Sequence, residues 1–209
     1  MKLYGSLTSP YVRKVRICLK EKGIACEFIV EDPWSDKTIT PTLNPLGKVP
    51  VLVLDHQKSL YDSALIVDYL DSLGGDRLIP ADGDARWDVL RWHALSHGIL
   101  DAVVARLMES RRSAEQQSSK LMARQESKIA RALEAADSAD KGRAYLIGER
   151  FTLADLSLGL ALEYIDFRYP HDWRSRHPRL AQWLAGMSRR ASFAETVPPG
   201  MERALDAPH

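Results

Sequence analysis

The hydrophobic pattern of this chain changes period once along its length, and that change constrains the fold more than any other feature. Up to about residue 74, short apolar runs typical of strands alternate with stretches of helical spacing. From residue 85 onward only the helical spacing remains. The chain is therefore expected to combine α/β with all-α structure in two successive domains.

Within the first part, the elements follow the order βαβ, then an irregular polar segment, then ββα. The strands are expected at residues 2–4, 26–30, 49–54 and 59–61, and the helices at about 10–22 and 63–73. A right-handed crossover makes the first two strands parallel, and the short turn before the last strand indicates a hairpin. This order predicts a thioredoxin-like domain at residues 1–76.

The remainder of the chain is predicted to be a linker and a helical bundle. Residues 77–84 contain turn-forming residues and are assigned to the linker. Residues 85–209 are expected to form an all-helical C-terminal domain, with helices at about 85–112, 118–139, 153–167 and 179–189. In the first of these helices, Trp87, His97 and Asp101 lie on the stripe that we expect to face inward. We interpret His97 and Asp101 as a pair at a domain or subunit boundary.

A capping box marks the third helix of the second part. Thr152 is expected to be the N-cap, and Asp155 stands at the third helical position in place of the more usual Glu or Gln. The residues that follow are apolar nearly all round, which predicts a central and buried helix. The motif is structural, so replacing Asp155 with Ala should cost on the order of 1 kcal/mol or more.

Composition and charge argue against several classes of protein. The 29 Lys and Arg residues balance 28 Asp and Glu, and a formal net charge of +1 calls for neither nucleic acid nor an anionic membrane as partner. No stretch approaches the roughly 18 apolar residues of a membrane span, and the N-terminus enters the first strand without a signal-peptide core. Cys18 and Cys26 have neither metal-ligand nor disulfide-framework spacing. We therefore expect a cytoplasmic protein without a metal site.

The turn Ser9-Pro10-Tyr11-Val12, between the first strand and the first helix, indicates a thiolate site. Ser9 fits the N-cap and Pro10 the first helical position. A helix N-terminus favours an anion and lowers the pKa of a thiol from its usual value of about 8.5. Enzymes of the glutaredoxin type carry Cys-Pro-Tyr-Cys at such a turn, whereas this chain supplies a hydroxyl and a valine. The sulfur is therefore expected to arrive with a ligand, for which glutathione is the obvious soluble candidate.

Four separated motifs, in their order and spacing, resemble the cytosolic glutathione transferases of bacterial type over essentially the whole chain. The motifs are Ser9-Pro10-Tyr11-Val12-Arg13-Lys14-Val15, Asn44-Pro45-Leu46-Gly47-Lys48-Val49-Pro50-Val51-Leu52, Tyr61-Asp62-Ser63 and Phe151-Thr152-Leu153-Ala154-Asp155. Maleylacetoacetate isomerase-like and stringent-starvation-like proteins share much of this pattern. The resemblance implies that glutathione is the co-substrate and that the protein is a homodimer.

The resemblance implies a role for each residue near the thiol. Ser9 would stabilise the glutathione thiolate, with Thr8 as the second choice and a plain helix cap as the alternative. Pro50 would be a cis-proline that turns the Val49 backbone toward the ligand, so that its N–H and C=O pair with the cysteinyl backbone. Lys48 would supply a cation for the glycyl carboxylate, and its alternative is a solvated surface lysine.

The γ-glutamyl end of glutathione is assigned to Asp62 and Ser63. Ser63 would hold the γ-glutamyl carboxylate at the positive end of a helix, and Asp62 would accept from the γ-glutamyl ammonium. The family usually has Glu or Gln where this chain has Asp62, which is shorter by one methylene. A plain Asp/Ser cap pair is the alternative for these two residues.

The second substrate is expected to bind between the domains, against the first helix of the C-terminal domain. The lining residues proposed for this site are Tyr11, Trp34, Met108, Arg111 and Arg112. The two arginines suggest an anionic second substrate, although arginines near a helix end are more often solvated.

The predicted function is that of a glutathione S-transferase in detoxification, which activates the thiol as thiolate for attack on a small electrophile. A serine site lacks the thiol of reductase-type and lyase-type members, so it favours conjugation, isomerisation or peroxide reduction. One alternative is a non-catalytic binding or regulatory protein on the same fold, such as a partner of the transcription machinery. Another is a glutathione-dependent isomerase or dehalogenase, which differs only in the second site.

Overall fold

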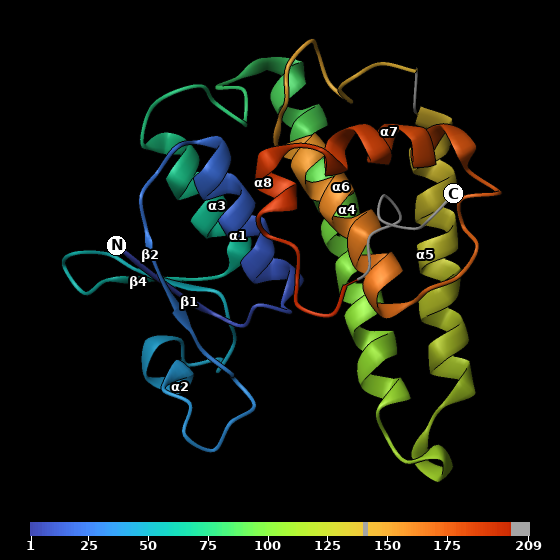
Figure 1. The fold of residues 1–209 in the computed structure, drawn as a ribbon, viewed down its shortest axis with the longest axis horizontal. Coiled ribbons are helices and arrows are strands. Elements are labelled where there is room, and N and C mark those ends of the chain that lie inside the picture. Colours follow the sequence, from blue (N-terminus) through green and yellow to red (C-terminus); the bar gives the residue numbers. More distant parts are fainter. Residues whose placement is uncertain (140–141, 202–209) are drawn as a thin grey trace. The chain divides into compact units, whose positions relative to one another are not determined.

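The computed structural model describes residues 1–139 and 142–201, which divide into two compact units (Figure 1). The first unit contains Met1–Ile79 together with Ala191–Gly200, and the second contains Pro80–Arg190. Each unit has its own buried apolar core. The two units are described in turn.

The first unit is built on a four-stranded mixed sheet with the order β2-β1-β3-β4. The strands are β1 (Lys2–Gly5), β2 (Glu27–Val30), β3 (Val51–Val53) and β4 (Ser59–Leu60). β1 pairs parallel with β2, whereas β3 runs antiparallel to both β1 and β4. The predicted parallel βαβ unit and the predicted hairpin are therefore confirmed, and with them the thioredoxin-like fold.

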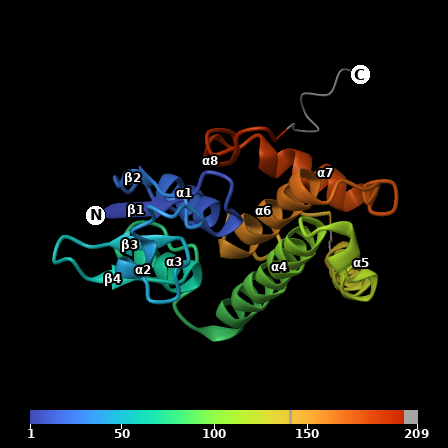
Figure 2. The same cartoon turned by 90° about the horizontal axis from the view of Figure 1, so that it is seen from below.

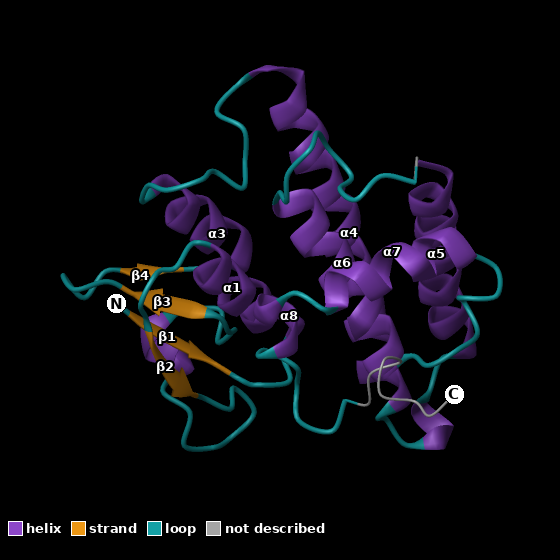
Figure 3. Ribbon diagram, turned by 45° about the horizontal axis from the view of Figure 1, so that its top comes forward, coloured by secondary structure: helices purple, strands orange, loops and turns teal. Residues whose placement is uncertain are grey.

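Helices α1 (Pro10–Glu21) and α3 (Ser63–Ser72) pack against each other beside the sheet (Figure 3), and the short α2 (Thr40–Leu43) contacts β3. The first turn of α1 lies very close to β1, because a Cβ added to Gly5 would stand 2.4 Å from a methyl group of Val12. The chain leaves α1 through Gly23, whose φ of +61° suits glycine. These contacts fix the position of the turn between β1 and α1.

The second unit is a bundle of helices, as predicted, and Figure 2 shows α4, α5 and α6 in it. Its helices are α4 (Gly83–Ser110), the 3₁₀ turn η1 (Ala114–Gln116), α5 (Ser119–Ala139), α6 (Leu153–Arg168) and α7 (Pro178–Ser188). Every residue of α6 from Leu153 to Ile165 is buried, and this helix packs extensively on α4. The prediction of a central and buried helix after the capping box is confirmed. Within the described residues, no helix is both long and apolar enough to cross a membrane.

Two side chains of α4 do not face inward as expected. Trp87 is 68% exposed. His97 and Asp101 do form a pair, with 3.8 Å between His97 Nε2 and Asp101 Oδ1, but the Asp101 side chain is 60% exposed. The helix buries a neighbouring set of side chains instead, because Trp92, His93 and Ser96 face the core.

Residues 191–200 belong to the first unit, although the sequence pattern grouped them with the helical domain. This segment contains the four-residue helix α8 (Ala191–Ala194), which is too short to show a period. Arg13 of α1, only 1% exposed, donates to the Phe193 carbonyl at 3.1 Å and to Thr196 Oγ1 at 3.3 Å. These contacts tie the segment to α1.

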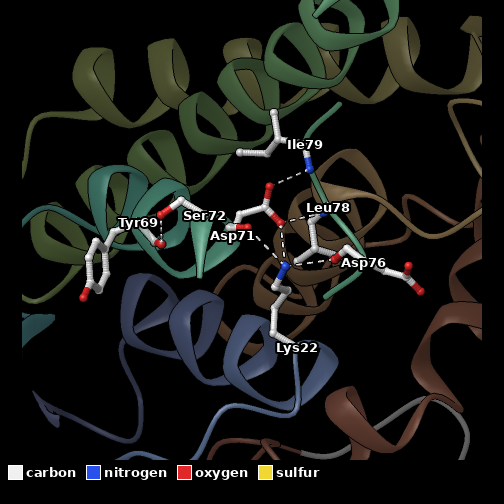
Figure 4. Close-up of polar contacts among 7 residues, drawn as sticks. All are labelled: Lys22, Tyr69, Asp71, Ser72, Asp76, Leu78 and Ile79. Atoms are coloured by element: carbon white, nitrogen blue, oxygen red, sulfur yellow. Dashed lines mark hydrogen bonds and ion pairs between the residues drawn. The ribbon is translucent and has the colours of Figure 1, made fainter. Parts of the chain in front are cut away.

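The predicted linker is partly fixed to the first unit by Asp71 of α3 (Figure 4). The Asp71 carboxylate accepts from the backbone N–H groups of Leu78 at 2.6 Å and Ile79 at 3.2 Å. Lys22 Nζ lies 3.3 Å from the same carboxylate and donates to the carbonyl of Asp76 at 2.9 Å. The side chains of Lys22 and Asp71 are only 1% and 3% exposed, so this ion pair is buried.

Replacing Asp71 with Ala is expected to lower the free energy of unfolding by about 3 kcal/mol, because it leaves a buried ammonium without its counter-ion and two backbone N–H groups without their acceptor. Urea unfolding of the purified variant measures this loss. Asp68→Ala is the matched control, since Asp68 is an exposed acid on the same helix. Equal unfolding free energies for the two variants would show that the Asp71 ion pair contributes nothing to stability.

Candidate functional site

Three segments that are far apart in the sequence meet at one end of the sheet in the first unit. Tyr4, near the end of β1, pairs with Val51, the first residue of β3. Leu60, the last residue of β4, pairs with Leu52. Residues 6–9 after β1, 48–50 before β3 and 61–63 after β4 therefore lie at the same end. All six residues that the sequence assigned to glutathione fall in these three segments.

Ser9 caps α1, as predicted. Its Oγ accepts from the backbone N–H of Val12 at 3.4 Å, and its side chain is only partly buried. Because the oxygen serves as acceptor in the cap, the hydroxyl proton can be donated to an anion at the helix N-terminus. The second candidate hydroxyl, that of Thr8, lies 3.3 Å from Ser6 Oγ.

The segment before β3 contains a cis peptide bond between Val49 and Pro50, as the resemblance implied. Pro50 is buried, Val49 is half-buried and Lys48 is exposed. Asn44, which is 2% exposed, holds the preceding turn, because its Nδ2 donates to the Lys48 carbonyl at 2.8 Å and its Oδ1 accepts from the backbone N–H of Leu46 at 3.0 Å. Asn44 belongs to the second of the four motifs, but no separate role was predicted for it.

At the start of α3, Asp62 and Ser63 have different environments. Asp62 is exposed and caps the helix, since its Oδ1 accepts from the backbone N–H of Ala64 at 3.0 Å. The bond between Tyr61 and Asp62 is cis. Ser63 is 1% exposed, and its Oγ accepts a hydrogen bond from Lys14 Nζ at 3.3 Å.

Lys14 is the residue of this region that sequence reasoning missed. Its side chain is wholly buried in α1, and its Nζ lies 6.0 Å from the centre of the Tyr11 ring. A signal was present, because Lys14 stands one turn from Cys18 on the apolar face of α1. A lysine on such a face needs a partner inside the protein.

The residues assigned to the second substrate fall in both units. Tyr11, half-buried, and Trp34, 77% exposed, belong to the first unit. In the second unit, Met108 is half-buried and Arg111 is exposed, whereas Arg112 lies 3.7 Å from the Glu109 carboxylate.

Tyr164 and Arg168 of α6 were not predicted from the sequence but belong with Arg111. Burial raises the pKa of the Tyr164 hydroxyl, and the nearby positive charges of Arg168 and Arg111 oppose that rise. The Arg168 guanidinium also lies 3.7 Å from the centre of the Phe167 ring. Two cations from different helices are thus near one buried phenol, which is a suitable environment for an anionic group.

Neither cysteine has the environment of a reactive thiol. Burial, more than the nearby Asp71 carboxylate, raises the pKa of Cys18 to about 12. Burial also raises the pKa of Cys26, which is half-buried. Both side chains are therefore protonated at neutral pH and are poor nucleophiles. Among residues 1–139 and 142–201, no group of three or more His, Cys, Asp or Glu side chains could hold a metal ion.

Comparison with known proteins assigns both parts of the chain. The family model described as glutathione S-transferase, N-terminal domain, matches residues 3–77, and that described as glutathione S-transferase, C-terminal domain, matches residues 119–186. The uncharacterized GST-like protein YibF of Escherichia coli is 36% identical over 206 residues, which cover 95% of this chain and 99% of that protein.

Two solved structures are similar over nearly their whole length. A glutathione S-transferase from Methylobacillus flagellatus, solved with glutathione bound, has 42% identity and a TM-score of 0.91, with 94% of this chain and 98% of that chain covered. A glutathione transferase family member from Pseudomonas fluorescens Pf-5, solved with bound S-(propanoic acid)-glutathione, has 38% identity and a TM-score of 0.84, with 95% and 99% covered.

Proposed function

Because this chain belongs to the glutathione S-transferase family, we propose that it binds glutathione at the sheet end of its first unit and activates the thiol for attack on a small electrophile. The observation that carries this proposal is the convergence of the Ser9, Val49–Pro50 and Asp62–Ser63 segments at that end. The Methylobacillus flagellatus relative, solved with glutathione bound, supports the same ligand here.

Each part of the tripeptide has a matching group at this end of the sheet. The Val49 N–H and C=O pair with the cysteinyl backbone as one more strand would. The exposed ammonium of Lys48 attracts the glycyl carboxylate. Ser63, at the positive end of α3, holds the γ-glutamyl carboxylate, and the exposed Asp62 accepts from the γ-glutamyl ammonium.

Ser9 has the role of donor to the glutathione sulfur. Its hydroxyl and the positive end of α1 stabilise the thiolate over the thiol, so the pKa of the bound thiol falls below its usual value of about 8.5. The thiolate electron pair then forms a sulfur–carbon bond with the electrophile, and the leaving group departs with its bonding pair. The high pKa of Cys18 and of Cys26 leaves this chemistry to the sulfur of the ligand.

For the second substrate, we propose an electrophile with an acid group. Arg111 and Arg168 act together on the Tyr164 hydroxyl, which favours a negative charge nearby. The adduct bound to the Pseudomonas fluorescens relative, S-(propanoic acid)-glutathione, carries such a group. Of the residues proposed from the sequence, Tyr11, Trp34, Met108 and Arg111 remain candidates, and Arg112 is a weaker one because Glu109 already balances its charge.

We also propose that the protein acts in the cytoplasm as a homodimer in detoxification. Exposed apolar side chains that a partner surface would cover are present on each unit, among them Leu65 and Leu73 on the first and Trp87 and Leu121 on the second. Analytical ultracentrifugation at micromolar concentration tests this, and a sedimentation coefficient of the single chain would contradict it.

Calorimetric titration with glutathione tests the proposed site directly. The parent is expected to bind glutathione with a Kd in the micromolar to millimolar range, which corresponds to a binding free energy of about −8 to −4 kcal/mol. The double variant Asp62→Ala with Ser63→Ala should lose this binding. The matched control is Asp68→Ala with Ser72→Ala, which removes the same residue types from exposed positions of the same helix. If the parent shows no binding heat, the fold serves as a partner-binding protein instead, and pull-down experiments follow.

A further inference from the structure

A lysine is completely buried beneath the proposed glutathione site. Lys14 has an exposed fraction of 0% and lies in the middle of α1, a helix whose other buried residues are mostly apolar. Lysines are almost never fully buried without a partner, because desolvating an ammonium is costly. Packing alone would be better served by an apolar side chain of similar length, so the charge at this position calls for a further role.

The direction of one hydrogen bond indicates that role. Lys14 Nζ lies 3.3 Å from Ser63 Oγ. An ammonium has three donors and no acceptor, so Ser63 Oγ must accept in this contact. The Ser63 hydroxyl proton then has to be donated in another direction. Lys14 therefore makes Ser63 a donor at the first residue of α3.

Other groups around Ser63 add to the same polarity. The N-terminal end of α3 carries the positive end of the helix dipole. The adjacent Asp62 carboxylate opposes this polarity, but it is exposed and its Oδ1 is engaged by the backbone N–H of Ala64. In a buried environment the Lys14 charge acts on nearby anions more strongly than a surface lysine would. The surroundings of the Ser63 hydroxyl are thus prepared for a carboxylate.

We propose that Lys14 is a positioning residue that orients the Ser63 hydroxyl toward the α-carboxylate of the γ-glutamyl group and adds charge to that subsite. The proposal rests on glutathione being the ligand. It assigns to Lys14 a selective effect on one carboxylate of the tripeptide. A lysine that only joined α1 to α3 would support every ligand of the site equally.

Two ligands that differ in one group separate these possibilities. Glutathione and 4-aminobutanoyl-cysteinylglycine share the thiol, the amide groups and the glycyl end, but the second lacks the α-carboxylate. Calorimetry of the parent is expected to give a Kd for glutathione that is at least about 10-fold lower than that for the analogue. In Lys14→Met the ratio of the analogue Kd to the glutathione Kd should fall toward one, because only the affinity for glutathione decreases.

Conservative and control variants complete the experiment. Lys14→Arg keeps a charged donor and should recover most of the ratio. Lys20→Met removes an exposed lysine from the same helix and should leave the ratio as in the parent. In steady-state kinetics, Lys14→Met should raise the KM for glutathione while kcat at saturation stays within about twofold of the parent value.

The possible results distinguish the two proposals. If Lys14→Met weakens both ligands by the same factor, or if the parent binds the two ligands equally well, the role of Lys14 is overturned while glutathione binding stands. If the parent binds neither ligand, the proposed function fails and the role of Lys14 fails with it. Should Lys14→Met not fold, Lys14→Gln replaces it, because Gln keeps a donor without the charge, and an unchanged ratio in Lys14→Gln also overturns the proposal.

Discussion

The Ser9→Ala variant is expected to lose at least about 10-fold in kcat at saturating glutathione, while its Kd for glutathione stays near that of the parent. The reason is that the Ser9 hydroxyl stabilises the thiolate rather than the tripeptide as a whole. One pKa unit corresponds to about 1.4 kcal/mol, so losing one donor should raise the pKa of the bound thiol by about one unit or more. Ultraviolet titration of the thiolate in the glutathione complex measures this shift.

Two controls separate the chemistry of Ser9 from its role as N-cap. Removing the cap costs about 1 kcal/mol of stability by itself, so the melting temperature of Ser9→Ala is measured beside its turnover. Ser9→Thr keeps a hydroxyl and should retain most of the activity. Thr8→Ala tests the neighbouring hydroxyl and should turn over like the parent. If Ser9→Ala turns over normally and Thr8→Ala does not, the catalytic role belongs to Thr8.

The second large effect is expected at Asp155, which is completely buried at the start of α6. Its carboxylate accepts from the backbone N–H groups of Leu146 and Thr152, both at 2.8 Å, and from Thr152 Oγ1 at 2.9 Å. Asp155→Ala leaves these buried donors unpaired, so the free energy of unfolding should fall by about 3 kcal/mol or more. Urea unfolding measures this loss, and a melting curve identical to that of the parent would contradict it.

Stability at Asp155 should also depend on pH. Burial raises the pKa of this carboxyl, and the hydrogen bonds from Leu146 and Thr152 only partly oppose that rise. The folded-state pKa of Asp155 therefore lies above the unfolded value of about 3.9. The stabilisation that follows from this shift is complete below a pH of about 3.9 and is lost as the pH rises through the folded-state pKa. The stability difference between the parent and Asp155→Asn should therefore be largest in acid and smaller at neutral pH. A difference that grows with pH would show that the folded protein favours the carboxylate.

Local signals explain why most of the fold could be predicted from the sequence. Ser9 with Pro10, and Thr152 with Asp155, fix two helix starts through contacts within one turn, and periodicity fixes the elements between them. The three segments of the candidate site could be assigned for a different reason, since each carries a recognisable motif. The βαβ and hairpin patterns implied the pairs β1–β2 and β3–β4. The pairing of β1 with β3, which brings the three segments to one sheet end, follows only from the thioredoxin-like arrangement as a whole.

What could not be predicted depends on contacts between distant residues. Lys14 is hydrogen-bonded to Ser63, 49 positions away, and residues 191–200 are held to α1 through contacts that include those of Arg13. Arg168 is the last residue of α6, and the sequence alone indicates only a cation that interacts favourably with a helix C-terminus. Only the packing of α6 on α4 shows that its charge and that of Arg111 both act on the Tyr164 hydroxyl.

The contacts of Arg13 with Phe193 and Thr196 also bear on how the protein is made. In many chains of two domains the N-terminal one folds while the ribosome is still translating the next, at about 5–20 residues per second. Here the partners of Arg13 in α1 are synthesised about 180 residues after it, which takes roughly 10–40 s at that rate. Until then, the Arg13 guanidinium lacks the two acceptors that residues 193 and 196 supply. We therefore expect the first unit to reach its full stability only after residues 191–200 have been synthesised.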